Sequence, residues 1–250
     1  MAKVFLSAGH GGSDPGAAAN GLKEKDINLK TLLACKSELE KHGVTVICSR
    51  VNDANDSVQE EVNEANASKA DVAVSFHANA GGGDGFEAFY YTKSTKGKKL
   101  AQLGEKYVKE LGQNSRGIKS GNHLYFIKNT SMTAVLFESF FVDNDKDNDI
   151  GDTAIEQQKF GVAYAKAILE YLDITKKSVA VETPKKAFEP YLVRINTAVL
   201  NVRSGVGTSY PITTSVRKGS VFTIIEERNG WGKLKSGIGW IKLSYTTKLK

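Results

Sequence analysis

The sequence is poor in cysteine, proline and histidine, and it has no long apolar run. Its 250 residues include two cysteines, four prolines and four histidines. Cys35 and Cys48 lie in segments predicted as a helix and a strand, so neither a disulfide framework nor a cysteine-rich metal site is indicated, and we expect both thiols to be buried. Because no run of about 18 apolar residues occurs, the sequence predicts neither a membrane-spanning helix nor a membrane partner.

The amino terminus also lacks the pattern of a signal peptide. The apolar stretch in "MAKVFLSAGHGG" is interrupted after a few residues, whereas a secretion signal needs a longer hydrophobic region. We therefore expect synthesis in the cytoplasm without a signal peptide. Hydrophobic residues make up 40% of the chain, so extensive disorder is not expected.

Charge is divided unevenly along the chain. Residues 1–173 contain 20 basic and 24 acidic residues, whereas residues 189–250 contain 10 and 3. The C-terminal part is therefore the basic one. Such a region favours a polyanionic partner, either nucleic acid or the anionic polymers of a cell wall, and charge alone does not choose between them.

Strand-like and helix-like segments alternate through residues 1–174. This alternation indicates an α/β fold with a largely parallel sheet, in which functional groups gather beyond the carboxyl ends of the strands. A capping-box pattern of Ser57 and Glu60 predicts the start of one helix. The predicted strands are 3–9, 44–50, 71–79, 85–91, 123–127 and 134–141, and the predicted helices are 25–43, 57–70, 96–112 and 153–172.

The pattern changes after residue 174. Residues 175–189 are charged and have no helical period, so they are predicted to be a linker. Short β-rich runs separated by turn residues fill residues 190–250, and "RNGW" and "KSGIGW" are typical of hairpin turns. This part predicts a small all-β barrel.

Two of the four histidines occupy equivalent positions. His10 and His77 each follow an apolar strand and precede small residues, so both rings can face one point beyond a parallel sheet. Glu24 stands just ahead of a predicted helix. Taken singly, each histidine could be a hydrogen-bonded structural residue, and Glu24 a first-turn glutamate that complements the helix dipole. Together they form a His–Glu–His set, and three such ligands with one open position are typical of a catalytic zinc site.

A carboxylate also ends another strongly apolar strand. Glu138 lies in "VLFESFF", where its burial is costly unless the group is paired or functional. Apolar surroundings raise the pKa of a carboxyl group, which suits the acid–base role that zinc-assisted hydrolysis requires. Asp14 is interpreted as a turn residue of the "GGSDPG" loop.

Five segments, in this order and spacing, resemble the zinc-dependent N-acetylmuramoyl-L-alanine amidases of the amidase-3 type. They are "SAGHGGSDPGA", "GLKEKDINL", "VSFHANA", "GFEAFYY" and "AVLFESFF". The resemblance implies one Zn²⁺ held by His10, Glu24 and His77, with Glu138 as the catalytic glutamate. It implies a twisted, mostly parallel sheet flanked by helices, and hydrolysis of the amide between N-acetylmuramic acid and the L-alanine of the stem peptide in cell-wall peptidoglycan.

Three further residues of this region bear on the substrate. Asn79 and His123 could contact the substrate or support the metal ligands. The resemblance departs at Glu61, where many relatives have an arginine. We expect Glu61 to lie away from the metal.

The C-terminal part resembles the bacterial SH3-like (SH3b) domains that attach wall hydrolases to peptidoglycan. The resemblance implies wall binding through Trp231, Trp240 and Tyr210, and the alternative is that the two tryptophans are core residues. Beside an amidase, a basic barrel is interpreted as a wall-targeting domain, because it raises the local concentration of substrate, and not as a nucleic-acid binder. The matching residues are Asn201, Arg203, Ser204, Gly205, Gly207, Tyr210, Pro211, Gly219, Trp231 and Trp240.

Together these patterns predict a modular, monomeric peptidoglycan amidase with a catalytic domain at 1–174, a linker at 175–189 and an SH3b-like domain at 190–250. The missing signal pattern favours a phage or prophage endolysin that acts on the wall after release and lyses its host. Three alternatives stay open: a host autolysin or sporulation amidase, a zinc peptidase that cuts the stem peptide, and a non-catalytic wall-binding protein. The intact ligand set argues against the last.

Overall fold

The computed structural model describes residues 2–174, 188–208 and 210–249. Its contacts divide the chain into two compact units, Met1–Lys177 and Ser178–Lys250, which are described separately. Most of the predicted linker, residues 175–187, lies outside the described residues. No helix in the described ranges is both long and apolar enough to cross a membrane.

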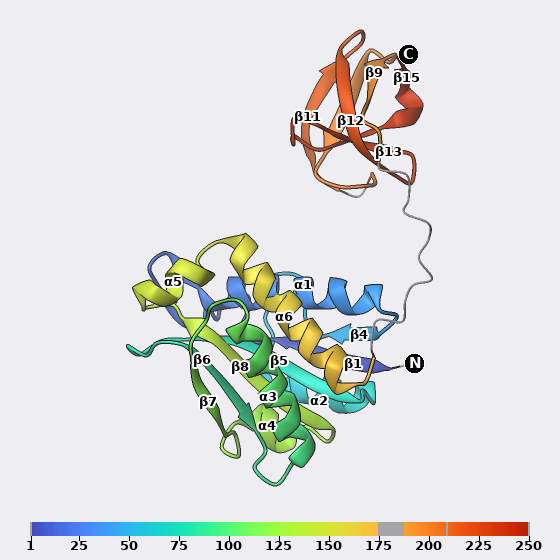
Figure 1. Ribbon diagram of the computed structural model, residues 1–250. Coiled ribbons are helices and arrows are strands. Elements are labelled where there is room, and N and C mark those ends of the chain that lie inside the picture. The colour runs from blue at the N-terminus through green and yellow to red at the C-terminus, as the bar shows by residue number, and fades with distance from the viewer. Residues whose placement is uncertain (1, 175–187, 209, 250) are drawn as a thin grey trace. The chain divides into compact units, whose positions relative to one another are not determined.

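A six-stranded sheet forms the centre of the first unit (Figure 1). The strand order is β4-β1-β5-β8-β6-β7, and every neighbouring pair is parallel except β6 with β8. The predicted mostly parallel sheet is thus confirmed. Its strands are β1 (Lys3–Ala8), β4 (Thr45–Cys48), β5 (Val72–Asn79), β6 (Phe86–Tyr90), β7 (Ser115–Ser120) and β8 (Thr133–Phe141).

Helices cover both faces of this sheet. Three long helices, α1 (Glu24–Lys41), α3 (Thr95–Lys109) and α6 (Ala154–Tyr171), pack together on one face. The shorter α2 (Val58–Ser68) and α4 (Tyr125–Asn129) cover part of the other. A helix α5 (Asp145–Gly151) follows β8, and a small hairpin of β2 (Ala18–Ala19) and β3 (Leu22–Lys23) precedes α1. The predicted capping box at Ser57 is present.

The main core lies between the sheet and the three long helices. Tyr164 of α6 is fully buried and stacks on Phe76 and Phe137, with ring centroids 5.3 and 4.6 Å apart. Its hydroxyl shares a hydrogen bond of 2.9 Å with Ser139. This packing fixes β5 and β8 against α6, so the carboxyl ends of both strands are held in place.

Some sequence predictions for this unit are wrong or incomplete. Residues 123–127 do not form a strand, because Tyr125–Asn129 form α4, and a short apolar run has no periodicity that separates the two states. The missing strand is β7, a polar edge strand with a glycine at its centre, which carries no apolar alternation. Cys35 is buried as expected, but Cys48 is only partly buried, and both are free thiols.

The second unit is an all-antiparallel sheet in the order β11-β10-β14-β13-β12-β9-β15. Asn229 and Gly230 form the tight turn between β12 and β13, with φ of 49° and 75°, so the hairpin predicted from "RNGW" is confirmed. Seven buried aliphatic residues, among them Val202 and Ile224, form its core. Its strands are β9 (Tyr191–Ile195), β10 (Val199–Arg203), β11 (Ile212–Arg217), β12 (Val221–Arg228), β13 (Trp231–Leu234), β14 (Trp240–Lys242) and β15 (Thr246–Lys248), with a 3₁₀ turn η1 (Leu243–Tyr245).

Candidate metal centre

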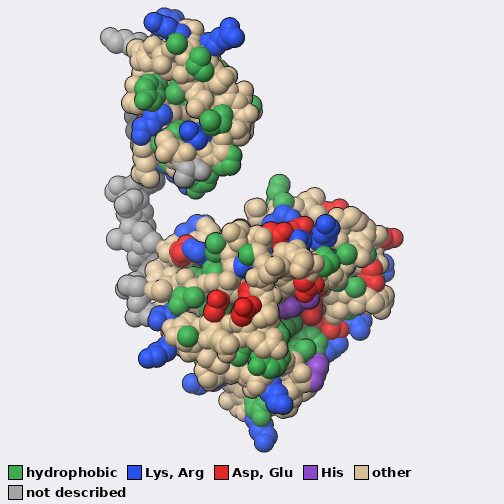
Figure 2. Space-filling model, turned by 180° about the vertical axis from the view of Figure 1, so that it is seen from behind, with side chains coloured by type: hydrophobic (Ala, Val, Ile, Leu, Met, Phe, Trp, Pro, Cys, Tyr) green, Lys and Arg blue, Asp and Glu red, His purple; other side chains and the backbone are tan. Residues whose placement is uncertain are grey.

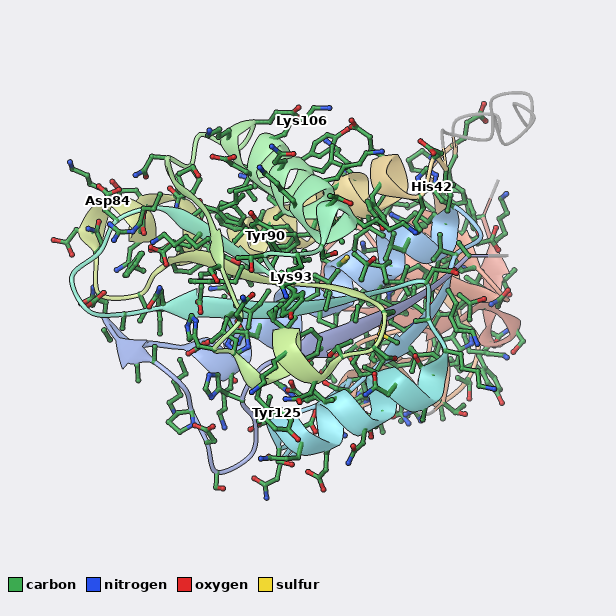
Figure 3. The ribbon with its side chains drawn as sticks, turned by 90° about the horizontal axis from the view of Figure 1, so that it is seen from below. His42, Asp84, Tyr90, Lys93, Lys106 and Tyr125 are labelled. Atoms are coloured by element: carbon green, nitrogen blue, oxygen red, sulfur yellow. The ribbon has the colours of Figure 1, made fainter. Side chains whose placement is uncertain are left out.

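Neighbouring parallel strands bring the two strand-end histidines together. β1 and β5 pair in parallel, with Ala8 opposite Phe76, so His10 and His77 emerge at the same edge of the sheet. Glu24 is the first residue of α1, whose start is held by hydrogen bonds to the loop that follows β1. His42, in contrast, ends α1 at the opposite end of the sheet from the β5–β6 loop that carries Asp84 (Figure 3).

Three ligand atoms converge on one point. Glu24 Oε1 lies 2.8 Å from His77 Nδ1 and 3.3 Å from His10 Nε2. One ligand atom from each residue lies within 4.8 Å of the other two, and the two rings are edge to face with centroids 5.3 Å apart. The donors are two imidazole nitrogens and one carboxylate oxygen, the set that suits a zinc ion with an open position.

The backbone around the centre is shaped by these side chains. His10 itself has φ of 64°, a left-handed conformation that is strained for a residue other than glycine. A Cβ on Gly9 would lie 2.1 Å from the His77 ring, and a Cβ on Gly16 would lie 2.5 Å from Glu24 Oε2 and 2.7 Å from the His10 ring. Glycine at both positions is therefore what lets the ligands approach each other.

Neighbouring groups orient each ligand. Asp14 Oδ2 lies 2.8 Å from His10 Nδ1, so it holds the ring with Nε2 toward Glu24. The amides of Ala17 and Ala78 donate to the Glu24 carboxylate at 2.8 and 3.2 Å. In metal sites, a ligand histidine commonly forms a hydrogen bond through the ring nitrogen that does not face the metal, as His10 Nδ1 does with Asp14. Asp14 also accepts the Gly16 amide, so it is a turn residue as predicted and a partner of His10 in addition.

The centre favours bound positive charge. The hydrogen bond to Glu24 raises the pKa of His10 to about 9, against the effect of burial. Burial also acts to lower the pKa of His77, but Glu24 outweighs it and the pKa is raised. For Glu24, burial acts to raise the pKa, but the two rings lower it well below its usual range. Beside this buried carboxylate the two imidazoles bind protons more readily when no metal is bound, and a metal ion would supply the same positive charge.

Glu138 lies beside the centre on the next strand. β5 and β8 pair in parallel with His77 opposite Glu138. Burial raises the pKa of Glu138 to about 7. Its Oε2 atom is buried and has no hydrogen-bond partner among the described residues. The group is thus placed and tuned to accept and release a proton near neutral pH.

The two residues predicted to contact the substrate occupy different surroundings. Asn79, at the end of β5, lies close to the Glu87 carboxylate, with 3.5 Å between Nδ2 and Oε2. His123 is exposed and packs edge to face on Phe89, 6.2 Å between ring centroids. Asn79 therefore lies near Glu87, which pairs with Glu138 across β6 and β8. The ring contact of His123 is with Phe89 and not with the three ligands.

A pocket of about 500 Å³ opens beside the two histidines. Its apolar wall includes Tyr125 of α4, which lies next to α2 (Figure 3). Glu61 lines the same pocket, so the expectation that it lies away from the metal is wrong. On the face seen in Figure 2, histidine surface adjoins acidic and hydrophobic side chains. Burial raises the pKa of Glu61, while the histidine rings and Ser7 oppose that effect.

The three aromatic residues of the second unit differ in exposure. Trp231 and Trp240 are 6% and 9% exposed, whereas Tyr210 is 47% exposed. Lys242 lies over the Trp231 ring, and Arg228 and Lys233 lie over Trp240. Both tryptophans are therefore largely buried, and Tyr210 is the one of the three that offers a large exposed surface.

Comparisons with known proteins match both units. A family model described as N-acetylmuramoyl-L-alanine amidase matches residues 4–170, and one described as bacterial SH3 domain matches residues 198–247. An endolysin of Bacillus phage SPP1 is 39% identical over 203 residues, which is 75% of this chain and 72% of that protein. The N-acetylmuramoyl-L-alanine amidase CwlM of Bacillus licheniformis is 35% identical over 72% of this chain and 73% of its own length.

A solved structure has the same fold as the first unit. The catalytic domain of CwlV, an N-acetylmuramoyl-L-alanine amidase from Bacillus (Paenibacillus) polymyxa, superposes with a TM-score of 0.65 at 32% identity. The match covers 70% of this chain and all of that domain.

Proposed function

This chain belongs to the N-acetylmuramoyl-L-alanine amidase family, and from that premise we propose that His10, Glu24 and His77 hold a catalytic zinc ion and that Glu138 is the acid–base group. The enzyme is a peptidoglycan amidase by family. The observation that supports the assignment is the position of Glu24 Oε1, in contact with a nitrogen of each ring. Glu138 stands in register with His77 on the adjacent strand.

The residues present fit a zinc ion. They supply three ligands of the types zinc prefers, and Asp14 and two backbone amides hold those ligands in orientation. When bound, zinc supplies Lewis-acid chemistry that polarises the scissile carbonyl and makes water a nucleophile at neutral pH.

Glu138 moves the proton in this proposal. Its unpartnered Oε2 takes the proton of the attacking water, and the same carboxyl then delivers it to the departing amine nitrogen of L-alanine. A pKa near 7 suits both halves of the transfer, because neither protonation state is strongly disfavoured.

For the biological role we propose lysis of a bacterial host, with residues 190–250 as the wall-targeting domain. Two findings support it: the relative from Bacillus phage SPP1 is named an endolysin, and the second unit matches the bacterial SH3 model. A host autolysin is the second candidate, because CwlM and a sporulation-specific amidase of Bacillus subtilis are also relatives, the latter 33% identical.

Digestion of purified cell walls tests the reaction. We expect released stem peptides with an L-alanine amino terminus, identified by mass spectrometry, and we expect a chelator to abolish their release until zinc is restored. Glu138→Ala should bind walls and release no peptide. Cleavage within the stem peptide would instead identify a zinc peptidase, and new reducing sugar ends would exclude an amidase.

The lysis role needs its own test. Expression of the protein in a Gram-positive host together with a membrane-permeabilising agent should cause rapid lysis, and Glu138→Ala should not. Cells that survive the active enzyme while their purified walls are digested would favour the autolysin role.

A further inference from the structure

A row of charged side chains crosses the sheet beside the metal centre. Glu138 on β8 stands in register with His77 on one side and with Glu87 of β6 on the other. Glu87 in turn accepts hydrogen bonds from Arg116 and Lys119 of β7, the edge strand. The row therefore ends, two strands beyond Glu138, in a pair of cations.

This basic pair carries more charge than its partner neutralises. The Glu87 side chain is 6% exposed, whereas those of Arg116 and Lys119 are 43% and 37% exposed. One buried carboxylate faces two cations, so within the part of the chain that the structure describes one positive charge remains at the surface without a paired carboxylate. Arg116 also lies over the ring of Phe141, 5.3 Å from its centroid, which places the guanidinium near the end of β8.

We propose that Arg116 and Lys119, held in place by Glu87, form an anion subsite that binds a carboxylate of the stem peptide and selects among stem peptides. The inference rests on the proposed amidase function and names a specificity determinant for it. A guanidinium and an ammonium that are already oriented lose little freedom when they bind a carboxylate, and such charge-assisted bonds are the strong ones.

The spacing of the strands indicates which carboxylate is bound. β7 lies two strands from β8, about 10 Å at the usual strand separation. An extended peptide advances about 3.3 Å per residue, so the second residue of the stem lies about 7 Å from the scissile amide. The α-carboxylate of that residue, which is free in a D-glutamate stem and absent in an amidated one, is within reach of the pair.

Charge on the other side of the centre sets the direction of the peptide. Asp14, Asp56 and Glu61 line the pocket next to His10 and His77. An anionic group is repelled there and attracted toward β7. The uncharged glycan is the part of the substrate that the acidic side can accept.

Two soluble substrates test the proposal. They are muramoyl dipeptides that differ only in whether the second residue carries a free α-carboxylate or its amide. We expect the wild-type enzyme to cleave the acid with a kcat/KM about tenfold higher, as one charge-assisted hydrogen bond would give. Lys119→Gln and Arg116→Gln should lose that preference, mainly through KM on the acid, and leave the amide unaffected. Lys93 is an exposed lysine that follows the end of β6 at Tyr90, and Lys93→Gln should retain the preference.

A binding measurement separates recognition from chemistry. In the Glu138→Gln background, calorimetry should show tighter binding of the acid than of the amide, and Lys119→Gln should abolish the difference. Lys119→Gln leaves Arg116 to neutralise Glu87, so it is the variant expected to fold if Arg116→Gln does not. Equal kcat/KM for both substrates in the wild type, or equal losses on both in Lys119→Gln, would overturn the subsite. Failure to cleave either substrate or walls would instead refute the amidase assignment.

Discussion

At the residue scale, His10 has φ of 64°, a conformation that costs a residue with a side chain about 1–2 kcal/mol. The strain is offset locally, because the ring is fixed between Asp14 and Glu24. Gly16 is also required, because any side chain there would displace Glu24 and His10. The ligand geometry thus depends on the loop after β1 as much as on the ligands.

Replacement of Gly16 should separate backbone strain from steric clash. Gly16→Ala combines a positive φ of 63° with a contact of 2.5 Å to Glu24, whereas Gly21→Ala has φ of 78° and no neighbour within 4 Å. We expect Gly21→Ala to cost about 1 kcal/mol of unfolding free energy and to bind zinc normally. Gly16→Ala should cost more and lose zinc, measured by metal analysis and chemical denaturation. Normal zinc content in Gly16→Ala would show that the ligands can move aside.

Asp14 offers a second test at this scale. Asp14→Asn keeps an oxygen for the Gly16 amide but removes the charge beside His10 Nδ1. We expect zinc affinity to fall about 10- to 100-fold, as for other partners of ligand histidines, with little change in melting temperature. Competition with a chromogenic chelator measures the affinity, and Asp149→Asn, at an exposed position of α5, is the control. Unchanged affinity would mean that Asp14 serves only the turn.

At the scale of elements, the register of the sheet brings the site residues together. Parallel pairing of β1, β5 and β8 brings His77 and Glu138, near the carboxyl ends of β5 and β8, to the same edge as the loop that carries His10. The antiparallel β6 adds Glu87 to the same row. The edge strand β7 has a polar sequence, and it stays in the sheet with the help of ion pairs from Arg116 and Lys119 to Glu87. Charge therefore contributes to the attachment of this strand.

The stabilisation from Glu87 should depend on pH. Burial acts to raise the pKa of Glu87, but Lys119 and Arg116 outweigh it, so the pKa is lowered. A carboxyl with a lowered pKa stabilises the fold above its unfolded pKa of about 4.3, and that stabilisation is lost as pH falls through the folded value. Glu87→Gln should therefore cost about 1 kcal/mol at pH 7, given the exposure of the two cations, and the difference should shrink below about pH 4. Denaturation curves of both proteins across this range decide the point, and a constant difference would contradict it.

Much of this layout could be predicted from the sequence because the buried strands are apolar and the three main helices are 15 to 18 residues long. The His–Glu–His set was identifiable since both histidines follow such strands. β7 and α4 could not be identified, because one has no apolar alternation and the other is too short for a period. Glu87 carried a usable signal: like Glu138, it is a carboxylate within an apolar strand, and the same cost of burial applies to it.

At the scale of the whole molecule, charge is divided between the two units. Residues 1–173 have a net charge of −4 and residues 189–250 a net charge of +7. An acidic catalytic unit has no electrostatic attraction to anionic wall polymers, whereas the basic unit does. In the proposed targeting role, the basic unit would hold the enzyme near a surface that its catalytic unit does not bind strongly, and this would raise the effective concentration of substrate.

Removal of residues 190–250 should therefore reduce binding to walls and leave turnover of a soluble muramoyl peptide unchanged. Cosedimentation with purified walls measures the first, and amine release measures the second.

Because exposed charges are screened by salt, binding of the full chain should weaken between low and high ionic strength, while the truncated protein should show little salt dependence. Tyr210→Ala distinguishes specific recognition from charge: it removes the exposed ring but no charge, so a loss of binding that persists at high salt would assign recognition to that surface. Wall binding that is equal with and without residues 190–250 would exclude the targeting role.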